Sequence, residues 1–254
     1  MRKLQPPYWL IGSLLCLAPA APAVLRGQEF RVETSVFAGE SRQPLAKNLA
    51  LFTEGLVFDI SLTGAETTVF DSAQQRFVLL DRQRSRHTEL NLEELGSYVA
   101  AVKQQGLETK EQYLFDPQFA VSYSDDSRRL TLTSDAVTYR VKGIVPPESH
   151  TAAVAHYRQF TDWSARLNAT HTASFPPFAR LELNGRLHDR NLLPEHVEFE
   201  YTPPGRAGSK AVYQSRQAFA WTLTDDDRRR IEETKRQLVE FTPVKFREYR
   251  ESRP

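Results

Sequence analysis

The histidines are the first residues in the sequence whose chemistry could support metal binding or acid–base catalysis. There are six of them: His87, His150, His156, His171, His188 and His196. None stands in the H-x-x-x-H or H-E-x-x-H spacing that places two ligands on one face of a helix. We therefore expect surface histidines, and we predict neither a metal site nor a cofactor.

Ser149 and His150 are neighbours in the chain, which raises the question of a serine hydrolase. The G-x-S-x-G pattern of a nucleophile elbow is absent from the sequence, as are the glycine patterns that cradle phosphates. A triad assembled from distant residues is defined by geometry and not by spacing. A hydrolase with a dispersed site therefore stays open as an alternative, although we expect that the protein is not an enzyme.

Aromatic side chains are concentrated in segments that we expect to be strands. They are Phe30, Phe37, Phe52, Phe58, Phe70, Phe77, Phe119, Tyr123, Tyr139, Phe199, Tyr201, Phe219 and Trp221. Such a set forms either an ordinary core beneath helices or the lining of an apolar pocket on a concave sheet, and alternation does not separate the two. For the pocket interpretation, the predicted ligand-binding residues are Phe58, Ile60, Phe70, Val78 and Leu80.

The N-terminus has the three parts of a cleavable secretory signal. Arg2 and Lys3 precede an apolar run from Tyr8 to Leu17, and small residues and prolines follow up to Ala23. The run is about half the length that a membrane-spanning helix needs. We predict a signal peptide at residues 1–23 and an exported protein, periplasmic or extracellular, that is not transmembrane after cleavage.

Residues 24–254 are expected to form one α+β domain. The only cysteine is Cys16, within the signal, so the mature chain can form no disulfide. Lysine and arginine number 33 against 32 aspartates and glutamates, and the formal net charge is +1. Because such a balance gives no electrostatic attraction to phosphates, we expect no nucleic-acid partner.

Alternating apolar and polar residues predict most of the strands. Six are expected between residues 30 and 91, three between 119 and 142, and two between 195 and 223. Strands that follow one another in hairpins with inserted helices indicate the α+β class. The predicted architecture is a curved antiparallel sheet, like a half-barrel, partly covered by three or four helices.

Four helices are predicted from periodicity and capping residues. The first is capped by Asn91 and ends at Gly106 in the left-handed conformation. The second and third cover residues 151–167 and 178–187, and the fourth covers 225–241 with Thr224 as its cap. The rest of the C-terminus is expected to be a short tail.

Two sets of segments resemble a group of exported bacterial proteins. The first set is Val32-Glu-Thr-Ser-Val-Phe, Leu51-Phe-Thr-Glu-Gly-Leu-Val-Phe-Asp, Val69-Phe-Asp and Phe77-Val-Leu-Leu-Asp, and the second is Phe178-Ala-Arg-Leu-Glu-Leu-Asn, Leu193-Pro-Glu-His-Val and Asp227-Arg-Arg-Arg-Ile-Glu-Glu. Because no activity is assigned to that group, the resemblance implies no function.

The order of elements is also similar to that of the periplasmic lipoprotein-carrier fold, an antiparallel half-barrel closed by helices. Strand pairs with Val-Phe-Asp and Phe-Val-Leu-Leu-Asp, followed by a helix, carry this similarity. It implies a non-enzymatic exported protein that binds an apolar ligand, such as lipid or lipoprotein acyl chains, on the concave sheet. A cell-envelope protein-interaction module with a filled core and no ligand is the second hypothesis.

Overall fold

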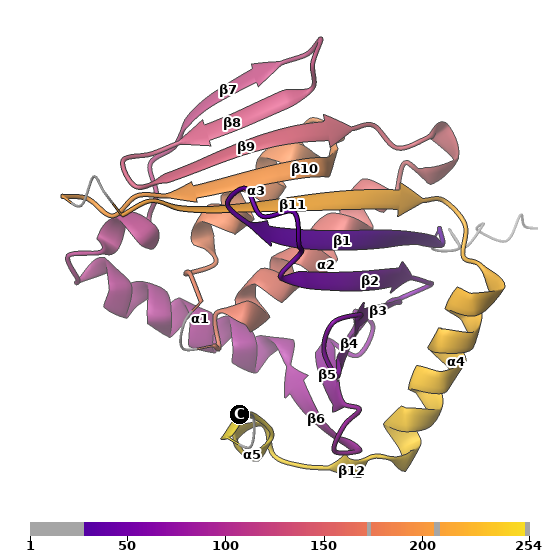
Figure 1. The fold of residues 1–254 in the computed structure, drawn as a ribbon. Coiled ribbons are helices and arrows are strands. Elements are labelled where there is room, and N and C mark those ends of the chain that lie inside the picture. Colours follow the sequence, from indigo (N-terminus) through magenta and orange to yellow (C-terminus); the bar gives the residue numbers. More distant parts are fainter. Residues whose placement is uncertain (1–27, 172–173, 206–208, 252–254) are drawn as a thin grey trace, which may run out of the picture.

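The computed structural model describes residues 28–171, 174–205 and 209–251 (Figure 1). Within these ranges the strands form one 12-stranded sheet, in the order β12-β6-β5-β4-β3-β2-β1-β11-β10-β9-β8-β7. Neighbouring strands pair antiparallel except for β12, which runs parallel to β6. The predicted α+β class with an open, largely antiparallel sheet is confirmed.

The bounds of the elements follow the chain order. The first six strands are β1 (Phe30–Ala38), β2 (Ala46–Phe52), β3 (Leu56–Ser61), β4 (Glu66–Asp71), β5 (Arg76–Asp81) and β6 (Arg86–Asn91). Helix α1 (Leu92–Leu107) leads to β7 (Ala120–Ser124), β8 (Arg129–Thr133) and β9 (Val137–Ile144). Helices α2 (Ala153–Asn168) and α3 (Phe178–His188) precede β10 (Leu193–Tyr201) and β11 (Ala211–Ala220), and the chain continues through α4 (Asp225–Glu240), β12 (Thr242–Pro243) and α5 (Phe246–Glu251).

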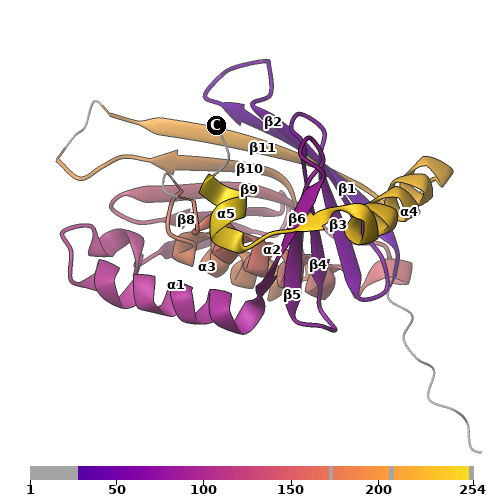
Figure 2. The same cartoon turned by 90° about the horizontal axis from the view of Figure 1, so that it is seen from below.

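The sheet bends, and its two faces are covered by different helices. Helices α1, α2 and α3 lie inside the bend, whereas α4 lies outside it against the first strands (Figure 2). We call the side facing α1–α3 the concave face and the opposite side the outer face. Because side chains alternate along a strand, each strand contributes to both faces.

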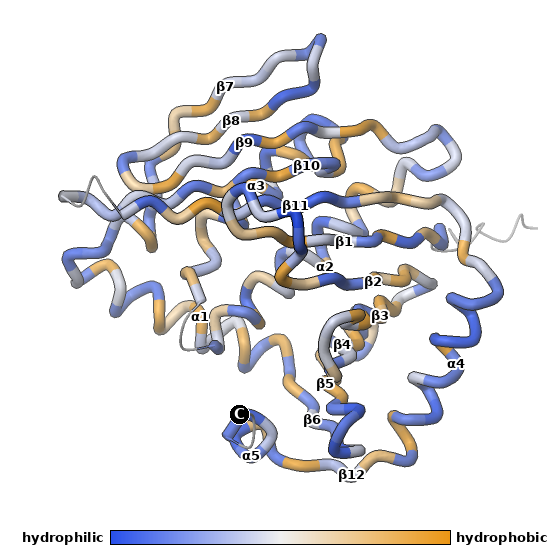
Figure 3. The backbone as a smooth tube through the Cα atoms, viewed as in Figure 1, coloured by the Kyte–Doolittle hydropathy of each residue, from blue (hydrophilic) through white to orange (hydrophobic). Residues whose placement is uncertain are grey.

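Helix α4 covers the outer face of the N-terminal half of the sheet. Its surface is mostly hydrophilic (Figure 3), but Ile231 is buried and Leu238 packs beside it. These residues meet a buried group on β2–β5: Leu49, Leu51, Phe58, Ile60, Val69, Val78 and Leu80. A helix that lies on one face of a sheet needs only a narrow apolar stripe on the side that contacts the sheet.

The two predicted N-caps are confirmed. The Asn91 side chain accepts a hydrogen bond from the Glu93 amide at 2.7 Å, at the start of α1. Thr224 and Asp227 form a reciprocal capping box at the start of α4. Each cap satisfies amide groups that would otherwise have no partner in the first turn.

The prediction for Gly106 is wrong. This glycine lies inside α1, which ends one residue later, and it does not have the positive φ of a left-handed cap. Its role is close packing, because a Cβ atom at this position would stand 2.2 Å from the Phe115 ring. The sequence drew attention to the right residue. Glycine is needed here, however, because of the neighbouring Phe115 ring and not because of the local backbone.

The C-terminal segment differs from the predicted tail. Thr242 and Pro243 add a short strand beside β6, and α5 then places Tyr249 in the core of the concave side. The Tyr249 hydroxyl donates a 2.9 Å hydrogen bond to Glu66. A strand of two residues and a helix of six are too short for sequence periodicity to reveal them.

The predicted signal peptide, including Cys16, lies outside the described residues. Among the described residues, no helix has both the length and the apolar character needed to cross a membrane.

Candidate functional site

The concave face carries a first group of aromatic rings between the sheet and α2. Phe30 and Phe52 stack with ring centroids 4.1 Å apart, and Phe52 meets Phe160 of α2 edge-on at 5.6 Å. Tyr157 of α2 contacts Phe219 of β11 at 5.5 Å. Offset and edge-to-face contacts of this kind strengthen packing beyond the area that they bury. Together with Phe70, Phe77 and Trp221, these residues are the first aromatic group.

A second aromatic group lies on the concave face of β9, β10 and β11 and extends to the surface. Tyr139 and Phe199 have centroids 5.0 Å apart, and Phe175 packs against Phe199 at 5.1 Å and Tyr201 at 4.9 Å. Phe175 and Tyr213 are large apolar side chains that remain 39% and 40% exposed. Exposed aromatic residues that continue a buried aromatic lining are typical of an entry to a binding site.

Polar residues separate the two aromatic groups. From α3, the Arg180 Nε donates a 2.9 Å hydrogen bond to Asn184 Oδ1, and Asn184 Nδ2 donates at 2.8 Å to Asp162 of α2. From the sheet, Asn48 donates at 3.0 Å to the Asp59 carboxylate. We call Asn48, Asp59, Tyr157, Arg180 and Asn184 the polar seam.

Burial shifts pKa values in the seam and beside it, although Asn48, Asp59 and Arg180 each keep part of their surface accessible to solvent. Burial raises the pKa of the Asp59 carboxyl, although the hydrogen bond from Asn48 works in the opposite direction. Burial also raises the pKa of Tyr157, while the nearby Arg180 guanidinium lowers it. Burial raises the pKa of Tyr139 to about 12, again opposed by Arg180. Arg180 therefore acts electrostatically on both aromatic groups.

Side chains fill the space between the concave face and the helices. At its edge, a hollow of about 70 Å³ is lined by Phe52, Val57, Phe70 and His156, among others. Gln217 of β11 is buried on the same face, and its Oε1 atom has no hydrogen-bond partner in the structure. A buried polar atom without a partner costs roughly 1–3 kcal/mol.

The five residues predicted to bind a ligand do not lie together. Phe58, Ile60, Val78 and Leu80 belong to the outer face beneath α4, where each is at most 4% exposed. Phe70 alone lies on the concave face, in the first aromatic group. The placement of the first four on a concave lining is therefore corrected: they do share one apolar face, but that face is covered by α4 and not by α1–α3. Binding by any of the five stays a prediction.

The structure also places the residues considered for catalysis. Ser149 Oγ lies 2.9 Å from His150 Nδ1, on the surface, and the His150 ring packs against Trp221. In the described part of the chain, no carboxylate completes this pair. Within the same ranges, no cluster of three or more histidine, cysteine or acidic residues could hold a metal ion.

The seam residues on the helices could not be identified from their sequence spacing. Arg180 and Asn184 are four residues apart, which is ordinary for a solvated helix face. Both belong to the segment Phe178-Ala-Arg-Leu-Glu-Leu-Asn, which carried the resemblance to exported proteins, and that was the only signal.

Comparison with known proteins gives a weak structural similarity. No sequence family and no curated protein matches the chain. A LolA superfamily protein from Nitrosomonas europaea is similar over 79% of this chain and 89% of its own, with 9% identity and a TM-score of 0.29. A DnaN sliding clamp from Bartonella birtlesii, bound to griselimycin, covers 80% of this chain and 59% of its own, with 11% identity and a TM-score of 0.12. With such low TM-scores, neither similarity determines what this protein binds.

Proposed function

We propose that the protein is an exported, non-enzymatic binding protein that takes an amphiphilic ligand, such as a lipid or a lipoprotein acyl chain, on its concave face. The observation that carries the proposal is the aromatic lining, which is interrupted by a charged seam and reaches the surface at Phe175 and Tyr213. An ordinary core needs neither a half-buried arginine beside its aromatic rings nor rings that continue into solvent.

The aromatic groups would hold the apolar part of the ligand. Each methylene group that moves from water into the apolar site contributes about 0.8 kcal/mol to the binding free energy. Even a partly inserted acyl chain would therefore be held by several times the thermal energy. The concave face is closed in this structure, and α2 and α3 would have to move away from the sheet to admit a chain.

Arg180 would hold the polar part of the ligand. A guanidinium keeps its charge and binds carboxylate or phosphate in a two-pronged geometry. In the closed structure its Nε is engaged by Asn184, and its charge acts on Tyr139 and Tyr157. When a ligand binds, Arg180 would give up these contacts and form stronger ones with the oppositely charged head group.

A second candidate function is that of a cell-envelope interaction module with no internal ligand. The specific observation in its favour is that side chains fill the concave side beside α2, where the hollow next to Phe52 and Phe70 holds only about 70 Å³. This candidate requires that α2 and α3 stay closed when lipid is present. The two candidates therefore differ in a directly measurable property of the concave face.

Tryptophan fluorescence can distinguish between the two candidate functions. Trp163 and Trp221 both pack against the first aromatic group, and the third, Trp9, lies in the predicted signal. Titration of the mature protein with palmitate, below its micellar concentration, should give a saturable shift in tryptophan emission. Trp163→Phe and Trp221→Phe variants assign the shift to α2 or to the end of β11. An emission spectrum that does not change with palmitate would support the interaction module instead.

A further inference from the structure

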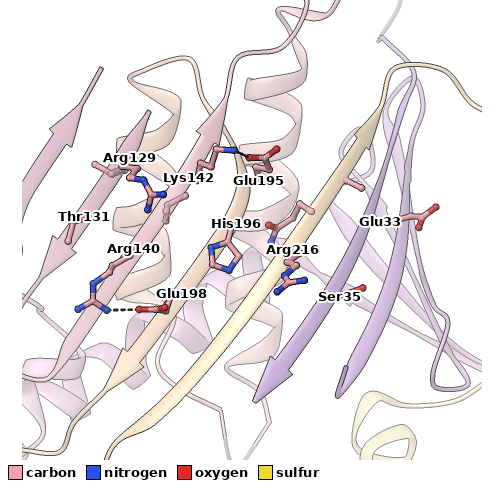
Figure 4. A pocket seen from close by; sticks show the side chains of 14 residues that line it. Glu33, Ser35, Arg129, Thr131, Arg140, Lys142, Glu195, His196, Glu198 and Arg216 are labelled. Atoms are coloured by element: carbon pink, nitrogen blue, oxygen red, sulfur yellow. Dashed lines mark hydrogen bonds and ion pairs between the residues drawn. The ribbon is translucent and has the colours of Figure 1, made fainter. Parts of the chain in front are cut away.

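A further hollow lies on the outer face, beyond the area that α4 covers. It has a volume of about 660 Å³ and is formed by β1 and β8–β11 (Figure 4). Its walls are charged, and strand backbone forms the floor at Leu130 and Val141, whose side chains lie in the concave core beside α3. The proposed ligand site is on the opposite face of the sheet, so this hollow needs a separate explanation.

Strand register places basic residues side by side across the hollow. Arg129 pairs with Lys142, Lys142 with His196, and His196 with Arg216. The same line continues through Ser35 to Lys47 of β2. Figure 4 shows Arg129, His196 and Arg216 in this order across neighbouring strands. With strands about 4.8 Å apart, the line of six residues spans roughly 24 Å. We call Arg129, Lys142, His196, Arg216 and Lys47 the basic row.

Most of the basic row lacks a carboxylate partner. Lys142 pairs with Glu195 at 2.5 Å, and Arg216 lies over the Phe37 ring at 5.1 Å. Among the described residues, no carboxylate forms an ion pair with Arg129, Arg216 or Lys47. Like charges on directly opposed strand positions destabilise a sheet. The row is therefore electrostatically unbalanced until a negatively charged group joins it.

The neighbouring charges distinguish between negatively charged partners. Next to the row, Arg140 binds both Glu198 and Glu200, and Glu33 and Glu195 stand at the rim. A uniformly anionic membrane surface would meet these carboxylates as well and would be repelled by them. A protein segment carries negative charges only at particular positions, so it can match the row and avoid the rim.

We propose that the basic row is a docking site for an acidic segment of a partner protein, with aspartate or glutamate side chains paired to Arg129, Arg216 and Lys47. The hollow accommodates the segment. Recognition would be sensitive to salt, because the cations are largely exposed.

The test measures binding of a fluorescein-labelled peptide of alternating glutamate and serine to the mature protein by anisotropy. The double variant Arg129→Glu/Arg216→Glu should bind about tenfold more weakly than the wild type, because two exposed pairs become repulsive. Arg229→Glu/Arg236→Glu on α4 is the matched control with the same change in net charge. It should change affinity by no more than about twofold, because those charges lie away from the hollow.

Three results would overturn the proposal. The peptide could fail to bind the wild type, or it could bind both double variants equally weakly. The third result is that the protein binds phosphatidylglycerol vesicles in preference to the peptide and loses this binding in Arg129→Glu/Arg216→Glu. Arg129→Lys/Arg216→Lys, which keeps the charge, should retain most of the affinity, and its failure to do so with an intact circular dichroism spectrum would also count against it. Palmitate binding should be the same in the wild type and in Arg129→Glu/Arg216→Glu, which separates this proposal from the ligand site on the concave face.

Discussion

Replacing Phe175 by aspartate is expected to weaken palmitate binding by at least about tenfold, which corresponds to the loss of roughly one aromatic contact. Phe175 is the exposed end of the second aromatic group, where its ring meets Phe199 and Tyr201. A carboxylate at this point would have to lose its water when an acyl chain passes, which opposes entry. The measurement is the tryptophan titration with palmitate.

Val239→Asp is the matched control for this prediction. Val239 is also an exposed apolar residue, at 87% exposure, but it lies on α4 over the outer face. The same charge at this position should leave palmitate binding unchanged, while Phe175→Leu should retain most of it. Equal loss of binding in Phe175→Asp and Val239→Asp would show that net charge, and not the aromatic entry, controls binding.

Replacing Asp227 by alanine is expected to lower the free energy of unfolding by about 3 kcal/mol, near the lower end of the range for breaking a buried ion pair. The Asp227 carboxylate is 1% exposed and accepts 2.8 Å hydrogen bonds from both the amide and the hydroxyl of Thr224. It also binds Arg31 of β1 at 3.1 Å. Its removal breaks the helix cap and leaves Arg31 without this partner, so α4 loses its attachment to the sheet.

Asp226→Ala provides the comparison within the same helical turn. Asp226 is exposed, and it pairs with Arg229 and Arg230 on the surface of α4. Because exposed pairs contribute at most about 1 kcal/mol, this variant should unfold at nearly the wild-type urea concentration. If urea denaturation shows equal losses for Asp226→Ala and Asp227→Ala, the attachment of α4 through Arg31 does not have the importance assigned to it.

The sequence was sufficient to predict the first eleven strands, the four long helices and two of the caps, because these depend on local patterns. Alternation identified β1 to β6 as strands, and Thr224 followed by three aspartates identified the start of α4. It did not reveal which strand face turns toward α2, because helices cover both sides of this half of the sheet and an apolar strand face can belong to either side. That is why Phe58 and Val78 were placed with Phe70, although they face α4.

The candidate sites were largely beyond prediction from the sequence. The polar seam joins Asp59 of β3 to residues of α2 and α3, more than ninety positions away in the chain. The basic row depends on the register of β8 to β11, and register is a property of strand pairing that no single strand contains. The exposed aromatic end at Phe175 arises because this loop residue meets Phe199 and Tyr201 of β10.

Native mass spectrometry of the protein, produced in a bacterial host and purified without detergent, tests the concave-face binding site most directly. We predict a reproducible added mass of a lipid or fatty acid, which disappears in Phe175→Asp and persists in Val239→Asp. A spectrum with only the mass of the mature chain, unchanged when palmitate or a lipopeptide is added, would contradict the proposed ligand-binding function.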